Sequence, residues 1–434
     1  MSLDARLLSA LNSWRSAPRW RVAFSGGLDS TVLLHLLVRL GRRERLPPLM
    51  AIHVHHGLQP AAEAWPGHCQ ALCEKLGVPL EVVSVSVATA SSMEQAARQA
   101  RYTAFAESLG ENEVLLTAQH RDDQAETLLF RLLRGAGVRG LAAMPAERPL
   151  GRGRLVRPLL GIGRVELEGY ARVHGLDWVD DPSNGNIEYS RNYLRHQVIP
   201  ALRRHWPQAA STIARATIHM AEAQTLLDEL AGMDIAAASA AGAYDWLPLP
   251  NLELSPLKAL SPARQRNALR HWLGDFTTLP DSDHWLGWES LRDASTDATP
   301  LWRIAAGELH RCGDRLWWLS GLWLQPAVGV VVWHDPGEQL QLPGNGVVRV
   351  AGLDGRARLE VRYRQGGEVM DVPARGRRDL KRLLNEAGVP VFLRSRLPLL
   401  YADGQLIAVA NMPHLSARPL SLGWEPPAAD AGLR

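Results

Sequence analysis

The feature that most constrains the fold of this chain is the glycine-rich segment Ser25-Gly26-Gly27-Leu28-Asp29-Ser30. It follows residues 20–24, an apolar strand-like run, and precedes residues 30–40, whose leucines recur at helical spacing. The paired glycines let the backbone turn tightly and approach a ligand, because neither carries a Cβ atom. The sequence therefore predicts a strand, a loop that contacts a ligand and a helix, in that order.

The chemistry of this loop suits an anion such as pyrophosphate. The first N–H groups of a helix have no internal partners and carry partial positive charge, and Ser25 and Ser30 add hydroxyl donors. Asp29 would repel a phosphate, so we expect it to bind a Mg²⁺ ion that bridges phosphates. No Gly-Lys-Ser/Thr sequence follows Gly27, so the segment is not a Walker loop. A glycine turn capped by serines is the alternative interpretation.

The first half of the chain alternates strand-like and helix-like runs. Further strands are expected at residues 50–55, 80–87 and 114–117, and further helices at 61–76, 93–109 and 122–133. This alternation is typical of a Rossmann-like α/β fold, a parallel sheet with helices on both faces. Ligands of such sheets lie beyond the carboxyl ends of the strands, which is where the glycine-rich loop is placed.

The pattern changes near residue 207, and we expect the first domain to span residues 1–207. A long helix over 208–232, helices over 261–272 and 284–292, and strands over 301–304 and 315–319 predict a mainly helical middle domain, residues 208–325. Strands at 347–350, 359–363 and 406–410 around a helix at 377–387 predict a small α+β domain, residues 330–434.

Composition excludes some classes of protein. No run of 18 apolar residues is present, so we expect no membrane partner, and the chain start lacks a signal-peptide pattern. The three cysteines suit a reducing cytoplasm, and Cys69 and Cys73 are expected to be ordinary helix residues. The net charge of +3 is too small to prove a nucleic-acid partner. Two locally basic stretches, residues 131–164 and 362–396, nevertheless suggest a large anionic partner.

A second candidate motif, Ala118 to Thr127, is acidic and follows a predicted strand. Asp122 and Asp123 lie four and three residues before Glu126, so the three carboxylates share one face at the start of a helix. Asp123 is a candidate to hold Mg²⁺ or to orient an ammonium group; the alternative is a charge that complements the helix dipole. His120 either positions a base or simply ends the strand.

Two further segments carry glycine and arginine. Gly135 and the glycines that follow it end a helix, either as a C-terminal cap or as a loop over a nucleotide. Arg191 and Arg195 share one face of a predicted helix, where they either meet the same anionic site or lie in solvent. Metal binding by His53 and its neighbouring histidines is not predicted, because no further ligand spacing appears.

These segments together resemble the N-type ATP pyrophosphatases, or PP-loop enzymes, and among them the tRNA(Ile)-lysidine synthetase family. The glycine-rich loop resembles the pyrophosphatase signature, and Gln119 departs from the histidine that is usual in the acidic motif. The segments His53–Leu58, Ala118–Thr127, Arg134–Leu141, Asp181–Asn184 and Arg191–Arg195 resemble the family elements HVxHxL, AHHxDDQxET, RGxGxxGL, DxSN and RNxxR, in family order.

The resemblance implies a ligase that uses ATP and Mg²⁺. Such an enzyme adenylates O2 of the wobble cytidine, position 34, in the tRNA(Ile) with anticodon CAU. The ε-amine of free L-lysine then attacks C2 and AMP leaves. The product reads AUA instead of AUG, and its amino-acid identity changes from Met to Ile. The middle and C-terminal domains are implied to bind the tRNA, and a homodimer is left open.

The resemblance also implies site residues. Those for ATP are Ser25, Gly26, Gly27, Leu28, Asp29, Ser30, His53 and Gly135; those for Mg²⁺ are Asp29 and Asp123; the catalytic ones are Asp29, Asp123, Glu126 and Arg191. Two rivals are kept. A PP-loop tRNA thiolation enzyme would need a reactive cysteine pair, for which the three cysteines are poorly placed, and a non-catalytic tRNA-binding protein would not need the intact loop.

Overall fold

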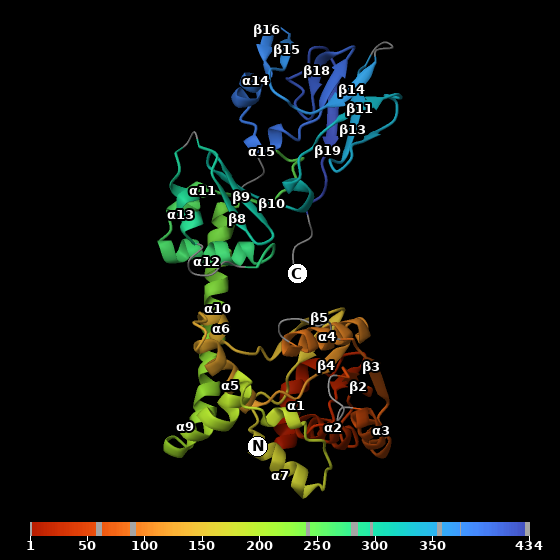
Figure 1. The fold of residues 1–434 in the computed structure, drawn as a ribbon, viewed down its shortest axis with the longest axis vertical. Helices are drawn as coiled ribbons and strands as arrows, with labels where there is room; N and C mark the ends of the chain where they lie inside the picture. Colours follow the sequence, from red (N-terminus) through yellow and green to blue (C-terminus); the bar gives the residue numbers. More distant parts are fainter. Residues whose placement is uncertain are drawn as a thin grey trace. The chain divides into compact units, whose positions relative to one another are not determined.

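The computed structural model describes residues 2–57, 63–86, 93–239, 244–278, 285–295, 298–353, 358–373 and 375–429. Leu58, the last residue of the histidine-bearing element, lies outside these ranges. The chain divides into two compact units, Met1–Thr225 and Leu226–Arg434, which are described separately (Figure 1). The finer division into three domains stays a prediction.

The first unit is built on a six-stranded sheet with the strand order β3-β2-β1-β4-β6-β5 (Figure 1). Its strands are β1 (Trp20–Ala23), β2 (Leu49–His55), β3 (Leu80–Ser84), β4 (Val114–Leu116), β5 (Glu147–Leu150) and β6 (Gly153–Val156). All pairings are parallel except that of β5 with β6. The predicted parallel α/β fold is confirmed. Sequence patterns missed β5 and β6, because these four-residue strands are interrupted by arginines and Pro149.

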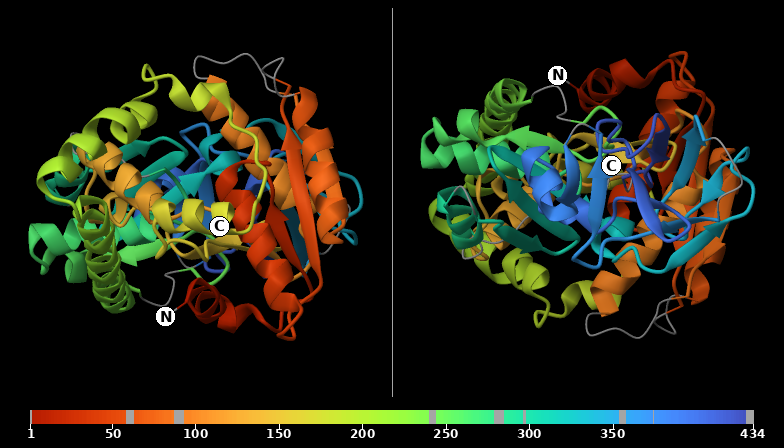
Figure 2. Two further views of the ribbon diagram at one scale, coloured as in Figure 1. Left: turned by 90° about the horizontal axis from the view of Figure 1, so that it is seen from below. Right: turned by 90° about the horizontal axis from the view of Figure 1, so that it is seen from above.

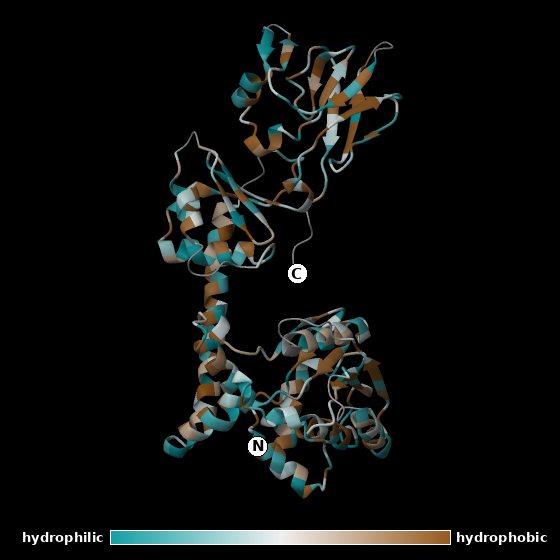
Figure 3. Ribbon diagram, viewed as in Figure 1, coloured by the Kyte–Doolittle hydropathy of each residue, from teal (hydrophilic) through white to brown (hydrophobic). Residues whose placement is uncertain are grey.

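Helices cover both faces of this sheet, as Figures 2 and 3 show. On one face Trp20 and Val22 share a core with α1 (Leu3–Leu11), α2 (Leu28–Gly41), α3 (Trp65–Leu76) and α7 (Arg164–Val173). On the other face Ile52 and Leu115 pack against α4 (Met93–Ser108). Strands that are buried on both faces read as continuous apolar runs, which explains why the sequence revealed them.

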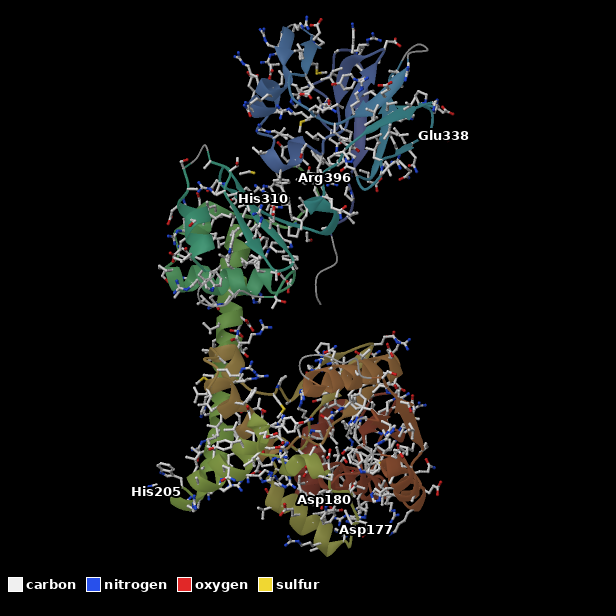
Figure 4. The ribbon with its side chains drawn as sticks, in the orientation of Figure 1. Asp177, Asp180, His205, His310, Glu338 and Arg396 are labelled. Carbon is white, nitrogen blue, oxygen red and sulfur yellow. The ribbon has the colours of Figure 1, made fainter. Side chains whose placement is uncertain are left out.

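A group of helices lies beside the carboxyl edge of the sheet. It contains α5 (Arg121–Leu132), α6 (Val138–Leu141), α8 (Ser190–Tyr193), a π-helical turn (Leu194–Val198), α9 (Ile199–His205) and the start of α10 (Ala209–Ala238). Ala125 of α5 packs against Ile199 and Ala210, so small side chains bring α5 close to α9 and α10. His205 marks the end of α9 in Figure 4.

The second unit begins with helices around a four-stranded antiparallel sheet, order β7-β10-β9-β8. Its elements are β7 (Asn251–Glu253), α11 (Leu254–Lys258), α12 (Pro262–Leu273), α13 (Leu286–Asp293), β8 (Leu301–Ile304), β9 (Gly307–Cys312) and β10 (Arg315–Ser320). The helical middle region was predicted, as were β8 and β10. His310, labelled in Figure 4, lies on β9, which sequence reasoning missed.

The remainder of the second unit is rich in β-structure. It comprises β11 (Val330–Trp333), β12 (Leu340–Gln341), β13 (Val347–Ala351), β14 (Leu359–Arg362), β15 (Val369–Val372), β16 (Gly376–Asp379), α14 (Leu380–Glu386), α15 (Val391–Arg394), β17 (Leu399–Ala402), β18 (Gln405–Val409) and β19 (Ser421–Glu425). The helix predicted from residue 377 begins instead at Leu380, because the Asp379 carboxylate accepts the Arg382 N–H at 3.1 Å and caps it. Over the described ranges, no helix is both long enough and apolar enough to cross a membrane.

Candidate active site

The sheet brings two distant loops to one edge. Strands β1 and β4 are parallel neighbours, with Trp20 opposite Val114 and Val22 opposite Leu116. Their carboxyl ends therefore coincide, and the glycine-rich loop and His120 leave the sheet side by side. The strand order reverses between these two strands, which is the point where open α/β sheets bind ligands.

Gly26 and Gly27 give the loop a shape that other residues would disturb. Gly26 has φ +80°, and a Cβ atom there would lie 3.0 Å from the Cys69 sulfur. Its carbonyl accepts the Val179 N–H at 2.9 Å, which ties the loop to the segment after α7. Gly27 is the N-cap of α2, so the first N–H groups of that helix face the loop. A phosphate contact by the backbone of Gly26, Gly27 and Leu28 stays a prediction.

The two serines of the loop have different surroundings. The Ser30 hydroxyl is buried, donates to the Gly27 carbonyl at 3.0 Å and accepts the Ser25 N–H at 3.3 Å. Ser25 is exposed, and its Oγ lies 3.1 Å from that of Ser30. Ser30 thus holds the loop together, and the Ser25 Oγ atom accepts the Gly27 N–H at 3.3 Å within the same loop.

His53 lies beneath the loop and not on its surface. Its ring is 3% exposed, its Nδ1 atom donates to the Phe24 carbonyl at 2.9 Å, and the Cys69 sulfur lies 3.4 Å from Nδ1. Burial is the main cause that lowers the pKa of His53, with the neighbouring His55 and His56 adding to it. A neutral, buried imidazole at this position fixes the end of β1 and so positions the loop.

Asp29 is the residue of the loop that fits a cation. Its Oδ1 atom is buried and has no hydrogen-bond partner within the described part of the chain. Burial opposes the charged carboxylate, but His120, Arg164 and Arg195 outweigh it, and the pKa of Asp29 is lowered. An ionised carboxylate with an unpartnered oxygen fits Mg²⁺, which usually takes one or two protein carboxylates and completes its shell with phosphates and water.

His120 is the N-cap of α5 and lies between three carboxylates. Its Nδ1 atom accepts the Asp123 N–H at 3.4 Å, and its Nε2 atom lies 3.6 Å from Asp29 Oδ2 and 3.5 Å from Asp123 Oδ2. The side chain is fully buried. Burial favours the neutral ring, but Asp29, Asp123 and Asp122 outweigh it, and the pKa of His120 is raised. Both roles considered for His120 stay predictions, and in the structure its ring lies between Asp29 of the loop and Asp123 of α5.

Asp123 and Glu126 are held by two arginines from the segment after residue 190. Arg195 donates to Glu126 Oε1 at 2.7 Å, to Glu126 Oε2 at 2.9 Å and to Asp123 Oδ1 at 3.0 Å. The Arg191 Nε atom donates to Glu126 Oε2 at 3.1 Å. The sequence left open whether these arginines meet an anionic site; the anions they contact are protein carboxylates. The π-helical turn sets the direction of Arg195, as such turns often do at functional sites.

Asp123 is therefore poorly placed to be a metal ligand in this conformation. Its Oδ2 atom accepts the His120 N–H at 2.9 Å, and its Oδ1 atom is paired with Arg195. A cation would have to displace one of these partners. No group of three or more metal-ligating side chains occurs in the described ranges.

Sequence reasoning did not predict the ion pair between Asp122 and Arg203, which belongs to the same network of charges. Asp122 Oδ2 accepts the Arg164 N–H at 2.9 Å, and its Oδ1 atom is ion-paired with Arg203. Burial opposes its charged form, but these partners outweigh it and lower the pKa of Asp122. Arg203 lies 81 positions from Asp122, and none of the motifs identified in the sequence contains it. Asp122 therefore links α5 to α7 through Arg164 and to α9 through Arg203.

Gly135 lies at the other end of α5. It has φ +72° and donates to the Leu132 carbonyl at 3.0 Å, the geometry of a helix C-cap. A helix the length of α5 spans roughly 18 Å, so Gly135 is not brought to the glycine-rich loop. The cap interpretation describes the backbone, and a nucleotide contact stays a prediction.

A cluster of arginines around Tyr102 was not expected. The guanidinium groups of Arg98 and Arg148 lie 4.9 and 5.0 Å from the centre of the Tyr102 ring. Arg157 follows the carboxyl end of β6, is buried, and donates to the Pro145 carbonyl at 2.7 Å. Burial opposes phenolate formation, but these arginines outweigh it and lower the pKa of Tyr102. Positive charge therefore gathers at the sheet edge that the loop occupies.

The cysteines have none of the properties of a catalytic thiol. Cys69 and Cys73 lie on α3 and are fully buried, as ordinary core residues. Burial raises the pKa of Cys69 to about 12 and that of Cys73 to about 11. A thiol of such pKa is not a nucleophile near neutral pH. The thiolation enzyme kept as an alternative finds no support in these residues.

The fold and the loop define the class as PP-loop enzymes. A model of the PP-loop domain matches residues 2–202, and models of the TilS substrate binding domain and the TilS substrate C-terminal domain match residues 252–317 and 359–418. The chain is 58% identical to a tRNA(Ile)-lysidine synthase of Pseudomonas fluorescens (strain Pf0-1), covering 100% of this chain and 99% of that one. It belongs to the tRNA(Ile)-lysidine synthase family and is therefore a ligase.

More relatives agree with this assignment. A tRNA(Ile)-lysidine synthase of Pseudomonas aeruginosa PAO1 is 60% identical over 99% of each chain. One from Escherichia coli O157:H7 is 42% identical over 90% of this chain and 91% of that one. A solved U34-tRNA thiolase from Methanococcus maripaludis covers 50% of this chain and 77% of that one with 17% identity and a TM-score of 0.43, too distant to carry an argument.

Proposed function

We propose that this protein joins L-lysine to C2 of the wobble cytidine in the tRNA(Ile) with anticodon CAU. ATP adenylates O2 of the base, pyrophosphate leaves, and the lysine ε-amine then displaces AMP. The observation that supports this most strongly is the similarity, over the whole chain, to relatives named tRNA(Ile)-lysidine synthase. We place the reaction in the cytoplasm, where ATP and tRNA meet.

The glycine-rich loop is proposed to hold the leaving pyrophosphate. The N–H groups of the first turn of α2 and the exposed Ser25 hydroxyl would donate to its oxygens, and preorganised donors stabilise charge that develops in the transition state. Asp29 would hold Mg²⁺ through the oxygen that lacks a protein partner. When bound, the ion neutralises charge on the departing phosphates.

Asp123 and Glu126 are our candidates to receive the proton of the lysine amine. An amine must lose its proton to attack, and a carboxylate within hydrogen-bond reach is a group that can receive it. Asp123 lies beside His120, which also contacts Asp29 of the loop, and Arg195 joins Asp123 to Glu126. The Arg191 side chain is 36% exposed and that of Arg195 is 24% exposed, so a ligand would reach Arg191 more readily than Arg195.

The basic stretches are proposed to contact the tRNA only in part. In the C-terminal stretch, Arg396 is buried and donates to the carbonyls of Leu322 and Gly344, so it has a structural role (Figure 4). Arg375 and Arg382 are ion-paired with Glu386. The exposed Arg377, Arg378 and Lys381 at the β15–β16 hairpin and the start of α14 are better candidates for phosphate contacts.

The proposed function is tested with labelled lysine, ATP, Mg²⁺ and total bacterial tRNA. We expect label in the CAU-anticodon tRNA(Ile) and tRNA-dependent exchange of pyrophosphate into ATP. Exchange without lysine transfer would point to another nucleophile, such as the sulfur of a thiolation enzyme. Tight tRNA binding with neither activity would favour a non-catalytic tRNA-binding protein.

A further inference from the structure

A hollow of about 730 Å³ opens in the first unit at the C-terminal end of α5, away from the glycine-rich loop. Its volume lies in the usual range for ligand sites. It lies between two segments of the chain, the end of α5 and the turn that leads into α8. The lining residues are Phe130, Leu133, Arg134, Ile187, Glu188, Ser190, Tyr193 and Leu194.

Large apolar side chains are exposed around this hollow. Leu133 is 76% exposed, Tyr193 is 50% exposed and Ile187 is 48% exposed. Leu132 and Tyr189 beside them are 50% and 46% exposed. Exposed apolar side chains that gather in one place usually mark a binding surface, whereas scattered ones carry no such meaning.

The wall of the hollow contains one arginine and two aromatic rings. The Arg134 guanidinium lies 5.0 Å from the centre of the Phe130 ring, and Tyr193 stands on the opposite segment. A flat ring, a flat cation and a second ring are the groups on which unstacked nucleobases lie in RNA complexes. Glu188 and Ser190 supply hydrogen-bond acceptors at the rim.

The hollow and the ion-pair network are built from the same two segments of the chain. Glu126 and Phe130 are four residues apart on α5, so they share one face and are separated by one turn, roughly 6 Å along the axis. On the other wall, Arg191 pairs with Glu126 while Tyr193, two residues later, lines the hollow. The two elements that hold the ion-pair network therefore also form the hollow.

We propose that this hollow binds a second unstacked base of the tRNA, the adenine that follows the wobble cytidine in the CAU anticodon. The proposal rests on the proposed function. A base next to the reacting one must leave the stack close to the active site, and its exocyclic amine donates to the Glu188 carboxylate, as amines of bases do to acidic side chains. Phe130 and Tyr193 stack on its faces, and Arg134 offsets the charge of the backbone.

The test uses a CAU anticodon stem-loop RNA and three variants of the full chain. Phe130→Leu and Tyr193→Leu keep apolar volume but remove the rings, and each is expected to weaken stem-loop binding by roughly five- to a hundredfold. Trp206→Leu, which removes an exposed ring outside the hollow, is expected to bind as the wild type does. Thermal unfolding and ATP binding of all three variants are compared with the wild type to confirm that they fold.

A second measurement identifies the base. The stem-loop carries purine, which lacks the amine, in place of the adenine after the wobble position. We expect the wild type to bind this RNA at least several-fold more weakly than the adenine form, and Glu188→Ala to bind both equally. Purine in place of an adenine on the other side of the loop is expected to change nothing.

The outcomes separate the two proposals. If the wild type neither binds the stem-loop nor transfers lysine to the tRNA, the proposed function fails. If the wild type does both but Phe130→Leu and Tyr193→Leu bind the stem-loop normally, the hollow is not a base site and this inference is overturned. Unchanged RNA binding with loss of self-association would overturn it too, because the surface would then contact a second copy of the chain.

Discussion

The two ends of α5 are built on different principles. At its N-terminal end Asp122, Asp123 and Glu126 are buried and each is paired with an arginine. At its C-terminal end Leu133 and Arg134 are exposed beside a hollow. Buried ion pairs fix positions because breaking one is costly, whereas an open apolar surface gains by being covered. If both proposals hold, one helix carries residues for the chemistry near its N-terminal end and a recognition surface at its C-terminal end.

The largest effect on activity is expected from the glycine-rich loop, which lies at the N-terminal end of α5. Asp29→Asn removes the charge that fits Mg²⁺, and we expect tRNA-dependent ATP–pyrophosphate exchange to fall on the order of 10²- to 10³-fold. Asp177→Asn, an exposed aspartate labelled in Figure 4, is the matched control and is expected to retain full exchange. Full activity of Asp29→Asn would remove the carboxylate from the mechanism.

The second-largest difference is expected in the free energy of unfolding, which should separate the two ends of α5. Glu126→Gln leaves Arg195 and Arg191 without their shared carboxylate, and we expect the free energy of unfolding to fall by about 3 kcal/mol in urea denaturation. Phe130→Leu, one turn further along, conserves most of the volume of a partly exposed ring and is expected to cost less than about 1.5 kcal/mol. Equal losses in the two variants would contradict the division of α5 into a buried and an open end.

The salt dependence of tRNA affinity should also distinguish the two ends of α5, and here the effect is expected at the C-terminal end. Arg134→Gln and Arg139→Gln remove exposed charges beyond the C-terminal end of α5, so each is expected to reduce the slope of log affinity for tRNA against log salt by roughly 1. Their stability and their ATP binding are expected to match the wild type. A slope that stays unchanged in both variants would exclude these arginines from the RNA contact.

The smallest effect is expected from the pH dependence of His120. Because its pKa is raised in the folded protein, the stabilisation by its charged form is complete below the ordinary histidine pKa and disappears as pH rises through the raised one. The difference in unfolding free energy between wild type and His120→Gln should therefore shrink between about pH 6 and pH 8. Asp29, whose pKa is lowered, loses its stabilisation only in acid and does not affect this window.

The matched control for that experiment is His205→Gln. His205 is exposed at the end of α9, where Figure 4 labels it. We expect its difference from the wild type to stay constant over the same pH range. A parallel trend in both variants would show that the pH dependence does not come from the His120 cluster.

Sequence patterns predicted the features of the structure that depend on interactions between neighbouring residues. The glycine-rich loop, the helix after it and the acidic start of α5 were visible because each depends on neighbouring residues. Spacing could not reveal that Arg195 pairs with Asp123 and Glu126, or that Arg203 pairs with Asp122, because these partners meet only through the packing of α5 against the segment from α8 to α9.

The remaining misses have similar physical reasons. Strand β16 was predicted as helix because its arginines favour helices in isolation, but it pairs with β15 and the Asp379 cap delays the helix. The contact of His53 with the nucleotide is not among these misses and stays a prediction, although its buried ring donates to the Phe24 carbonyl next to the loop. The hollow beside Phe130 is formed by residues about 60 positions apart, and no sequence period indicates it.

The measurement that tests the central claim most directly is mass spectrometry of the nucleoside at the wobble position. The CAU-anticodon tRNA(Ile) is incubated with the protein, ATP, Mg²⁺ and isotopically labelled L-lysine, and then digested. We predict that the wobble cytidine gains the mass of one labelled lysine less one water, with one AMP and one pyrophosphate formed for each nucleoside changed. An unchanged cytidine, or one that has gained sulfur, would contradict the proposed function.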